Sequence, residues 1–174
     1  MNSDKEILFM GPQGSGKTLL LKRLQTLTDE KKLTPFDQIP NTNSTNGLET
    51  TNFKFRGVNF AFKELGGSSI SEWETHAKSA KVIIYVFDAA DLTKTATNIV
   101  WLHELLTCQS IESKPIMILL SKCDVPDCIR FSVIDEILGF ERMLNPQRFK
   151  YIETSSVVGV GLSEIFHWIS DQMK

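Results

Sequence analysis

The sequence lacks any long hydrophobic run. Its first apolar stretch, residues 7–10, is far shorter than a signal-peptide core or a membrane span, so we expect neither export nor membrane crossing. Densely basic stretches are absent too: 19 basic and 21 acidic residues give a formal charge of −2, which argues against nucleic acid as a ligand. The three cysteines, Cys108, Cys123 and Cys128, show no paired short spacing. We expect reduced thiols in a cytosolic protein and no zinc site.

Signals for lipid attachment are missing at both ends of the sequence. Residue 2 is Asn2, whereas myristoylation requires glycine, and residues 171–174 contain no cysteine for prenylation. We therefore expect no direct membrane anchor. With 174 residues, 41% of them hydrophobic, the chain is long enough to form a core without disulfides. No break in composition marks a second domain, so residues 1–174 are predicted to form a single one.

Apolar strand-like runs alternate with helical patterns along the chain, which is typical of an α/β fold. A polar loop is predicted at 28–50, and a loop of that length in a compact domain is usually functional or disordered. Aromatic residues alternate with polar ones on both sides of 56–59, which predicts an antiparallel hairpin. The other expected strands are 6–10, 82–87, 115–120 and 151–153, and the clearest helices are 17–27, 95–108, 132–138 and 162–173, in a total of about six strands and five helices.

Between the first strand and the first helix, the sequence Gly-Pro-Gln-Gly-Ser-Gly-Lys-Thr fits the phosphate-binding loop G-x-x-x-x-G-K-[ST]. In such a loop, glycines let backbone N–H groups face the phosphates, and the helix N-terminus adds its positive end. Lys17 supplies a positive charge, and Thr18 supplies a hydroxyl ligand for Mg²⁺. The predicted phosphate-binding residues are Gly11, Pro12, Gln13, Gly14, Ser15, Gly16, Lys17 and Thr18.

Kinases, ATPases and GTPases all use this loop, so other segments must identify the nucleotide. Residues 121–124, Ser-Lys-Cys-Asp, follow a predicted strand and resemble the guanine-reading N-K-x-D of GTPases. The carboxylate of Asp124 can accept hydrogen bonds from the ring N1–H and the exocyclic amine of guanine, and the stem of Lys122 can pack over the base. Ser121 replaces an asparagine, and its shorter side chain is not expected to reach the phosphate loop. Alone, 121–124 also fits an ordinary strand-end turn.

A third segment follows the last predicted strand. Residues 154–156, Thr-Ser-Ser, resemble the part of GTPases in which a backbone N–H meets the guanine O6. By position, Ser156 is the donor and Ser155 lies beside it. Taken by itself, a serine-rich turn carries little information. The order of the three segments along the chain is what supports a guanine site.

Residues 63–68, Lys-Glu-Leu-Gly-Gly-Ser, resemble the W-D-x-G-G-Q of the ADP-ribosylation-factor family of small GTPases. Residues 82–91 and 161–169 are similar to the fourth strand and the last helix of that family, so the likeness covers nearly the whole chain. It implies a P-loop small GTPase fold. We expect a six-stranded, mostly parallel sheet with one antiparallel edge hairpin, flanked by about five helices.

The resemblance also implies two switch segments. Counting back from Glu64 with the family's spacing aligns Thr45 with the switch I threonine, which binds Mg²⁺ only when a γ-phosphate holds the loop closed. Because this loop contains many hydroxyls, the assignment of Thr45 depends on that spacing. Gly67, in switch II, is expected to offer its N–H to the γ-phosphate, since a side chain could block that approach.

Two residues depart from the family pattern at the phosphate end of the predicted site, the part that binds the phosphates and Mg²⁺ rather than the base. Glu64 replaces an aspartate that holds Mg²⁺ through water, so the longer side chain either shifts the ligands of the ion or contacts the ion directly. Ser68 replaces the glutamine that orients the attacking water, and it is too short for that role. We therefore expect slow intrinsic GTP hydrolysis. Glu72 and His76 are alternative water-orienting groups.

Three function classes remain open: a cycling GTPase, a GTP-binding interaction module without hydrolysis, and a P-loop nucleoside or nucleotide kinase. The arginines are scattered rather than gathered in a lid, which disfavours the kinase. We expect a monomer that binds GTP or GDP with Mg²⁺ and meets effectors and regulators through switch I, the hairpin 51–65 and switch II. The resemblance implies a cytoplasmic, cilium-associated protein that acts in ciliary or vesicle trafficking.

Overall fold

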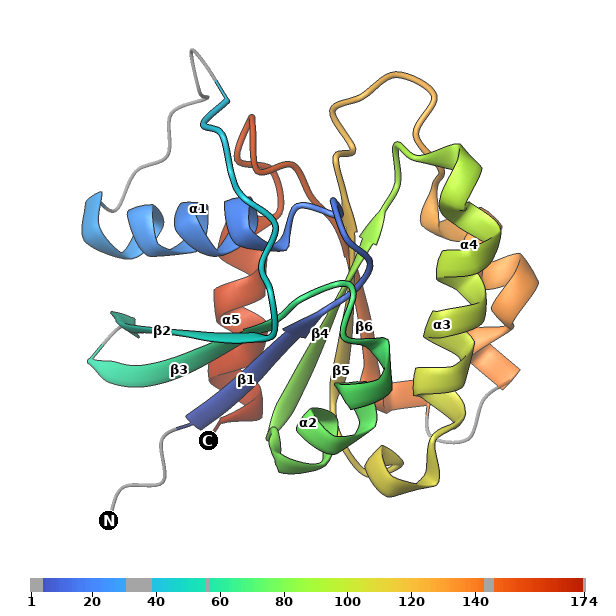
Figure 1. Ribbon diagram of the computed structural model, residues 1–174, viewed down its shortest axis with the longest axis horizontal. Helices are drawn as coiled ribbons and strands as arrows, with labels where there is room; N and C mark the ends of the chain where they lie inside the picture. Colours follow the sequence, from blue (N-terminus) through green and yellow to red (C-terminus); the bar gives the residue numbers. More distant parts are fainter. Residues whose placement is uncertain (1–4, 31–38, 56, 143–145, 174) are drawn as a thin grey trace.

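The computed structural model of the protein describes residues 5–30, 39–55, 57–142 and 146–173. They form a six-stranded sheet with the strand order β2-β3-β1-β4-β5-β6 (Figure 1). Only the edge pair β2–β3 is antiparallel, and all other neighbours are parallel, as predicted. The strands are β1 (Lys5–Met10), β2 (Leu48–Phe55), β3 (Val58–Leu65), β4 (Val82–Asp88), β5 (Ile116–Ser121) and β6 (Phe149–Glu153).

Helices cover both faces of this sheet. One face packs against α1 and α5, and the other packs against α2, α3 and α4 (Figure 1). All residues of β4 are buried, and its odd-numbered and even-numbered hydrophobic residues enter different clusters. A strand buried on both faces needs a continuous apolar run, which is why the sequence pattern was so clear here. The α-helices are α1 (Lys17–Glu30), α2 (Trp73–Ser79), α3 (Thr95–Thr107), α4 (Phe131–Leu138) and α5 (Leu162–Gln172).

The loop and turn boundaries differ from the sequence-based expectations. Helix α1 continues to Glu30 and β2 begins at Leu48, so the loop is shorter than the predicted 28–50. The hairpin turn is also tighter than the predicted 56–59, because Gly57 has a φ of +85° and Val58 already starts β3. Residues 31–38 of the loop and Arg56 of the turn lie outside the described residues. So do residues 1–4 and 174, at the two ends of the sequence where lipid-attachment signals were not found.

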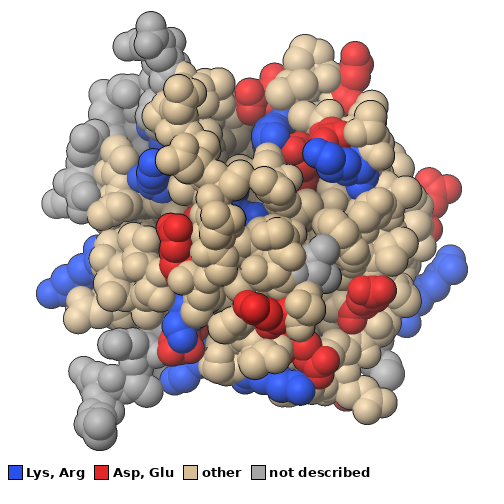
Figure 2. Space-filling model, in the orientation of Figure 1, with Lys and Arg blue, Asp and Glu red and all other residues tan. Residues whose placement is uncertain are grey.

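The distribution of surface charge and the character of the helices bear on the expected partners. On the face shown in Figure 2, acidic and basic side chains are interspersed, in line with the small formal charge. Within the described part of the chain, no helix combines the length and the apolar character needed to cross a membrane.

The topology gathers the predicted motifs at one edge of the sheet. Strands β1, β3, β4, β5 and β6 run parallel, so their carboxyl ends meet at the same edge, where doubly wound sheets bind ligands. The segments that follow or end these strands are 11–18, 66–68, Asp88, 121–124 and 154–156.

Candidate functional site

The phosphate loop connects β1 to α1 and passes close to β4. Gly11 has a φ of +142°, and a Cβ at this position would overlap the carbonyl oxygen of Val86, so a side chain does not fit. Lys17 is only 5% exposed, and its Nζ donates hydrogen bonds to the carbonyl oxygens of Gly11 and Pro12, both at 2.9 Å. The loop thus closes around the ammonium group of its own lysine.

Burial lowers the pKa of Lys17 to about 8, and the carboxylate of Glu64 opposes that shift. Desolvation disfavours the charged form of a lysine, whereas a nearby negative charge favours it. An anionic group placed beside Lys17 would therefore stabilise its ammonium.

Three oxygen-bearing side chains meet beside this lysine, and they are the three predicted Mg²⁺ residues. The hydroxyl of Thr18 donates to Oε1 of Glu64 at 2.6 Å, and the hydroxyl of Thr45 donates to the same oxygen at 3.0 Å. The two hydroxyl oxygens lie 3.3 Å apart. Thr18 lies in α1, Thr45 in the loop before β2, and Glu64 in β3.

This oxygen cluster fits Mg²⁺ in its chemistry and its spacing. Hydroxyl and carboxylate oxygens are hard ligands of the kind that Mg²⁺ prefers. The two hydroxyl oxygens lie 3.3 Å apart, close to the edge of about 3.0 Å expected between neighbouring ligands of an octahedron with metal–oxygen bonds of about 2.1 Å. The residues present therefore fit the ion that the fold family implies.

A polar cavity of about 120 Å³ lies between the P-loop, the loop before β2, Glu64 and Gly67. A Cβ on Gly67 would overlap the backbone nitrogen of Gln13, and the N–H of Gly66 donates to the carbonyl oxygen of Gly47 at 2.8 Å. The Gly66–Gly67 segment after β3 therefore contacts both the phosphate loop and the loop before β2. Only a glycine at position 67 permits this approach.

Neither Ser68, at the position of the missing glutamine, nor the two alternative water-orienting groups, Glu72 and His76, line this cavity. Ser68 is exposed and is absent from the cavity lining. Nε2 of His76 lies 3.7 Å from a carboxylate oxygen of Glu72, so these two side chains pair with each other along one helical face. The structure does not bring either of them to the phosphate end.

At the base end, the expectation for Ser121 was wrong. Its hydroxyl lies 2.7 Å from the carbonyl oxygen of Ser15 and 3.0 Å from that of Phe87, so it does tie the end of β5 to the P-loop. Ser121 is buried there. The P-loop lies close enough to β5 for a short side chain to reach it.

Lys122 crosses the site rather than pointing into solvent. It has a φ of +62°, and its Nζ donates to Oδ2 of Asp88 at 2.6 Å and to the carbonyl oxygen of Gly14 at 2.8 Å. Asp88 also accepts hydrogen bonds from the N–H groups of Ala90 and Asp91. Asp88 was not identified as a site residue from the sequence; its place at the end of β4, beside the end of β5, is the signal that could have indicated the contact with Lys122.

Asp124 and the segment 154–156 lie beside the ion pair of Lys122 with Asp88. Asp124 is exposed, and the N–H of Cys123 donates to the carbonyl oxygen of Thr154 at 3.1 Å, which holds the two segments together. The buried Ser155 hydroxyl accepts hydrogen bonds from the backbone N–H groups of residues 157 and 158, both at 3.2 Å. Ser155 thus shapes the loop with its side chain, whereas Ser156 is half-buried next to it.

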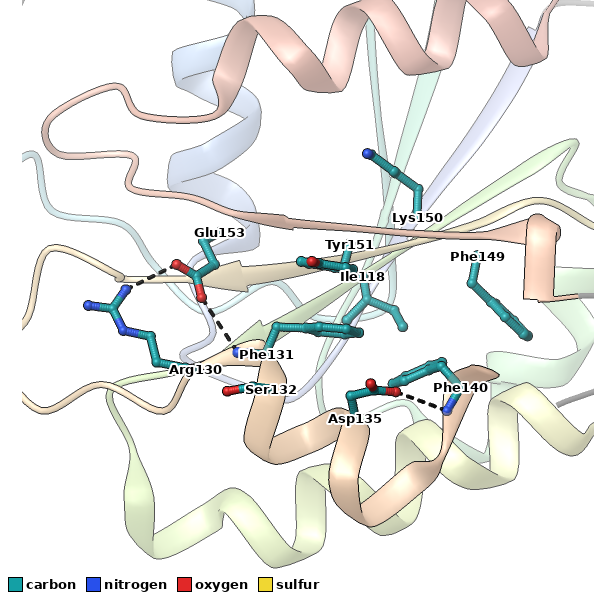
Figure 3. A pocket seen from close by; sticks show the side chains of 10 residues that line it. All are labelled: Ile118, Arg130, Phe131, Ser132, Asp135, Phe140, Phe149, Lys150, Tyr151 and Glu153. Atoms are coloured by element: carbon teal, nitrogen blue, oxygen red, sulfur yellow. Dashed lines mark hydrogen bonds and ion pairs between the residues drawn. The ribbon is translucent and has the colours of Figure 1, made fainter. Parts of the chain in front are cut away.

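A larger cavity, of about 500 Å³, lies elsewhere, between α4 and the edge strand β6 (Figure 3). Its lining mixes aromatic with charged and polar side chains, and the rings of Phe131 and Tyr151 stack with centroids 3.5 Å apart. Arg130 and Glu153 form an ion pair of 3.0 Å at its rim. None of the sequence motifs lies here, so chemistry rather than size identifies the candidate site.

The fold and the phosphate end together define a P-loop small GTPase. The sequence model of the ADP-ribosylation factor family matches residues 1–173. The chain therefore belongs to the ADP-ribosylation factor family, which rules out the kinase alternative.

Several relatives show how far the chain has diverged. ADP-ribosylation factor-like protein 1 of Drosophila melanogaster is 25% identical over 173 residues, covering 98% of this chain and 90% of the relative. Human ADP-ribosylation factor-like protein 16, which residues 16–25 and 64–67 also resemble, is 26% identical over 164 residues, covering 93% and 83%. The Arl6 small GTPase of Trypanosoma brucei, solved with the nucleotide analogue GppNp, has the same fold, with a TM-score of 0.79, 19% identity, and coverage of 97% of this chain and 96% of that one.

Proposed function

We propose that this protein binds GTP and GDP with Mg²⁺ and works as a GTP-dependent switch with weak intrinsic hydrolysis. The observation that carries this proposal is the contact of Thr45 with Thr18 and Glu64. It joins switch I, the P-loop and the end of β3 in one oxygen cluster. A γ-phosphate and Mg²⁺ stabilise closed switch loops of this kind and release them on hydrolysis.

In this proposal, Mg²⁺ is held by the hydroxyl oxygens of Thr18 and Thr45, with Glu64 beside them. The ion supplies neutralisation of negative charge on the phosphates. Glu64 accepts both hydroxyl hydrogen bonds, so the remaining lone pairs of the two threonine oxygens are left to face a cation. Lys17 adds the fixed positive charge from the P-loop.

Guanine recognition is assigned to Asp124, with Lys122 and Ser156. A titration with fluorescent analogues of GDP, GTP and ATP, carried out in Mg²⁺ and in EDTA, tests this assignment of guanine recognition. We expect both guanine nucleotides to bind at least about 100-fold more tightly than ATP, because a site built on specific hydrogen bonds rejects a ligand that lacks them. Equal binding of ATP would contradict the assignment.

The proposal of weak hydrolysis rests on Ser68, which is too short to orient water, and it is supported by the exposed position of Ser68 outside the cavity lining. Replacing Ser68→Gln should raise the rate of single-turnover GTP hydrolysis, because a carboxamide there can orient water. The rate is measured by chromatography of nucleotide released from preloaded protein, with Ser69→Gln as the control. An unchanged rate in Ser68→Gln would contradict this account of slow hydrolysis. If neither wild type nor Ser68→Gln hydrolyses GTP, the binding module without hydrolysis becomes the better description.

Protein effectors and regulators are proposed to dock on switch I, the hairpin 51–65 and switch II. The edge strand β2 supports this, since an edge strand presents backbone groups that a partner strand can pair with. The proposed cytoplasmic, cilium-associated location and the role in ciliary or vesicle trafficking rest on family resemblance. Imaging a fluorescent fusion in ciliated cells tests them, and a fusion absent from the cytoplasm and the cilium would overturn them.

A further inference from the structure

The phosphate cavity contains a carboxamide whose side chain was given no role of its own in the sequence analysis. Gln13, on the P-loop, lines the cavity together with Lys17, Thr45 and Gly67. Its side chain is exposed to solvent although the loop beneath it is buried around Lys17. A group in this position can meet both a phosphate and a water molecule.

The orientation of this carboxamide is set by switch I. Nε2 of Gln13 donates a hydrogen bond to the hydroxyl oxygen of Ser44 at 2.9 Å. With the NH₂ group engaged by Ser44, the carbonyl oxygen Oε1 is left as an acceptor for another donor. Ser44 directly precedes Thr45, so the same closure that completes the oxygen cluster also fixes Gln13.

Gln13 also lies beside the point at which the missing glutamine would begin. A Cβ on Gly67 would overlap the backbone nitrogen of Gln13, so these two backbones are in direct contact. Ser68 is the next residue, and its own side chain does not line the cavity. The carboxamide that residue 68 lacks is therefore available from the neighbouring P-loop.

We propose that Gln13 orients the water that attacks the γ-phosphate, with Ser44 as its positioning residue; this rests on the GTP site proposed above. Oε1 accepts a hydrogen bond from the water, whose oxygen forms a bond to the γ-phosphorus. The bond from that phosphorus to the β–γ bridging oxygen breaks, and GDP departs with the electron pair. The water's protons stay with the released phosphate, so Gln13 is unchanged.

The test compares Gln13→Ala, Ser44→Ala and the control Gln172→Ala after GTP affinity has been measured for each. Gln172→Ala removes an exposed glutamine side chain from α5, at a position outside the cavity lining. Single-turnover hydrolysis should fall about tenfold or more in Gln13→Ala and about threefold in Ser44→Ala, and stay within about twofold in Gln172→Ala. GTP affinity should change little in all three.

A second readout separates chemistry from structure. GDP with aluminium fluoride mimics the transferring phosphoryl group, so its trapping should be lost in Gln13→Ala while binding of GDP alone persists. Wild-type hydrolysis rates and trapping in Gln13→Ala would overturn the inference, as would wild-type protein that binds GTP but never hydrolyses it. Wild-type protein that fails to bind GTP would instead overturn the proposed function.

Discussion

The phosphate end and the base end of the site have both lost a family residue, with different consequences. At the base end, Ser121 is shorter than the expected asparagine but still reaches the carbonyl oxygen of Ser15. At the phosphate end, Glu64 is longer than the expected aspartate and still reaches Thr18 and Thr45. Ser68 differs, because its exposed side chain does not enter the cavity. The contacts of Ser121 and Glu64 that hold the site together tolerate a change of side-chain length, whereas at position 68 the shorter side chain leaves the cavity altogether.

The largest effect is expected from removing the charge at the phosphate end. Lys17→Ala should weaken binding of GTP and GDP by about 100-fold or more, because a buried ammonium facing phosphate is lost. Lys22→Ala, at an exposed position of the same helix, is the control. Titration with fluorescent nucleotide measures both, and equal affinities would show that the P-loop does not hold phosphate.

The next effect belongs to the base end and changes selectivity. In Asp124→Asn an amide N–H replaces a carboxylate acceptor, so the protein should lose about 100-fold in GTP affinity and gain affinity for xanthosine triphosphate, which offers an acceptor there. Asp127→Asn, also exposed in this loop, should bind as wild type. Competition between the two nucleotides is the measurement. Unchanged selectivity in Asp124→Asn would remove the base-reading role of this residue.

A pH dependence sharpens the comparison, because the phosphate end holds Lys17, whose pKa is lowered by burial. The pKa of Lys17 is lowered to about 8 in the free protein, and bound phosphate raises it. Below pH 8 the lysine is already protonated, so affinity changes little. Above pH 8, binding must take up a proton, and affinity should fall by up to about tenfold per pH unit. Calorimetry at pH 9 in buffers of different ionisation enthalpy checks this, and no proton uptake would contradict it.

The same lysine also affects the folding stability of the free protein, which should rise with pH where nucleotide affinity falls. Between pH 8 and the ordinary lysine pKa of 10.5, the unfolded chain binds more protons than the folded one. The contribution of Lys17 to folding stability therefore rises with pH in this range. Comparing thermal unfolding of wild type and Lys17→Ala at pH 7 and pH 10 isolates it. If the stability of wild type relative to Lys17→Ala does not increase from pH 7 to pH 10, the lowered pKa of Lys17 is contradicted.

The smallest effect is expected at Ser121. Ser121→Ala removes one hydrogen bond to the P-loop and leaves the carbonyl oxygen of Ser15 without it, at a cost of about 1–3 kcal/mol. For a protein of this size, we expect the melting temperature to fall by several degrees. Ser163→Ala, exposed on α5, is the control. No loss of stability would mean that the contact with Ser15 is not needed.

Much of the fold could be predicted from local patterns in the sequence. Runs such as 82–87 and 115–120 are so apolar and so short that they indicate strands buried on both faces. The extension of α1 to Glu30 was missed because Thr28-Asp29-Glu30 carries no apolar periodicity. Contacts across the site could not be predicted, because they depend on how separate loops pack. The hydrogen bond from Gln13 to Ser44 joins residues 31 positions apart, and the reach of Ser121 depends on where the P-loop lies.

The most direct test of the central claim is the identity of the nucleotide that accompanies the protein. The protein is purified with Mg²⁺ and no added nucleotide, then denatured, and the released small molecules are separated by anion exchange. We predict close to one guanine nucleotide per chain, with GTP in excess over GDP because hydrolysis is slow. Protein that carries ATP, or no nucleotide, would contradict the account.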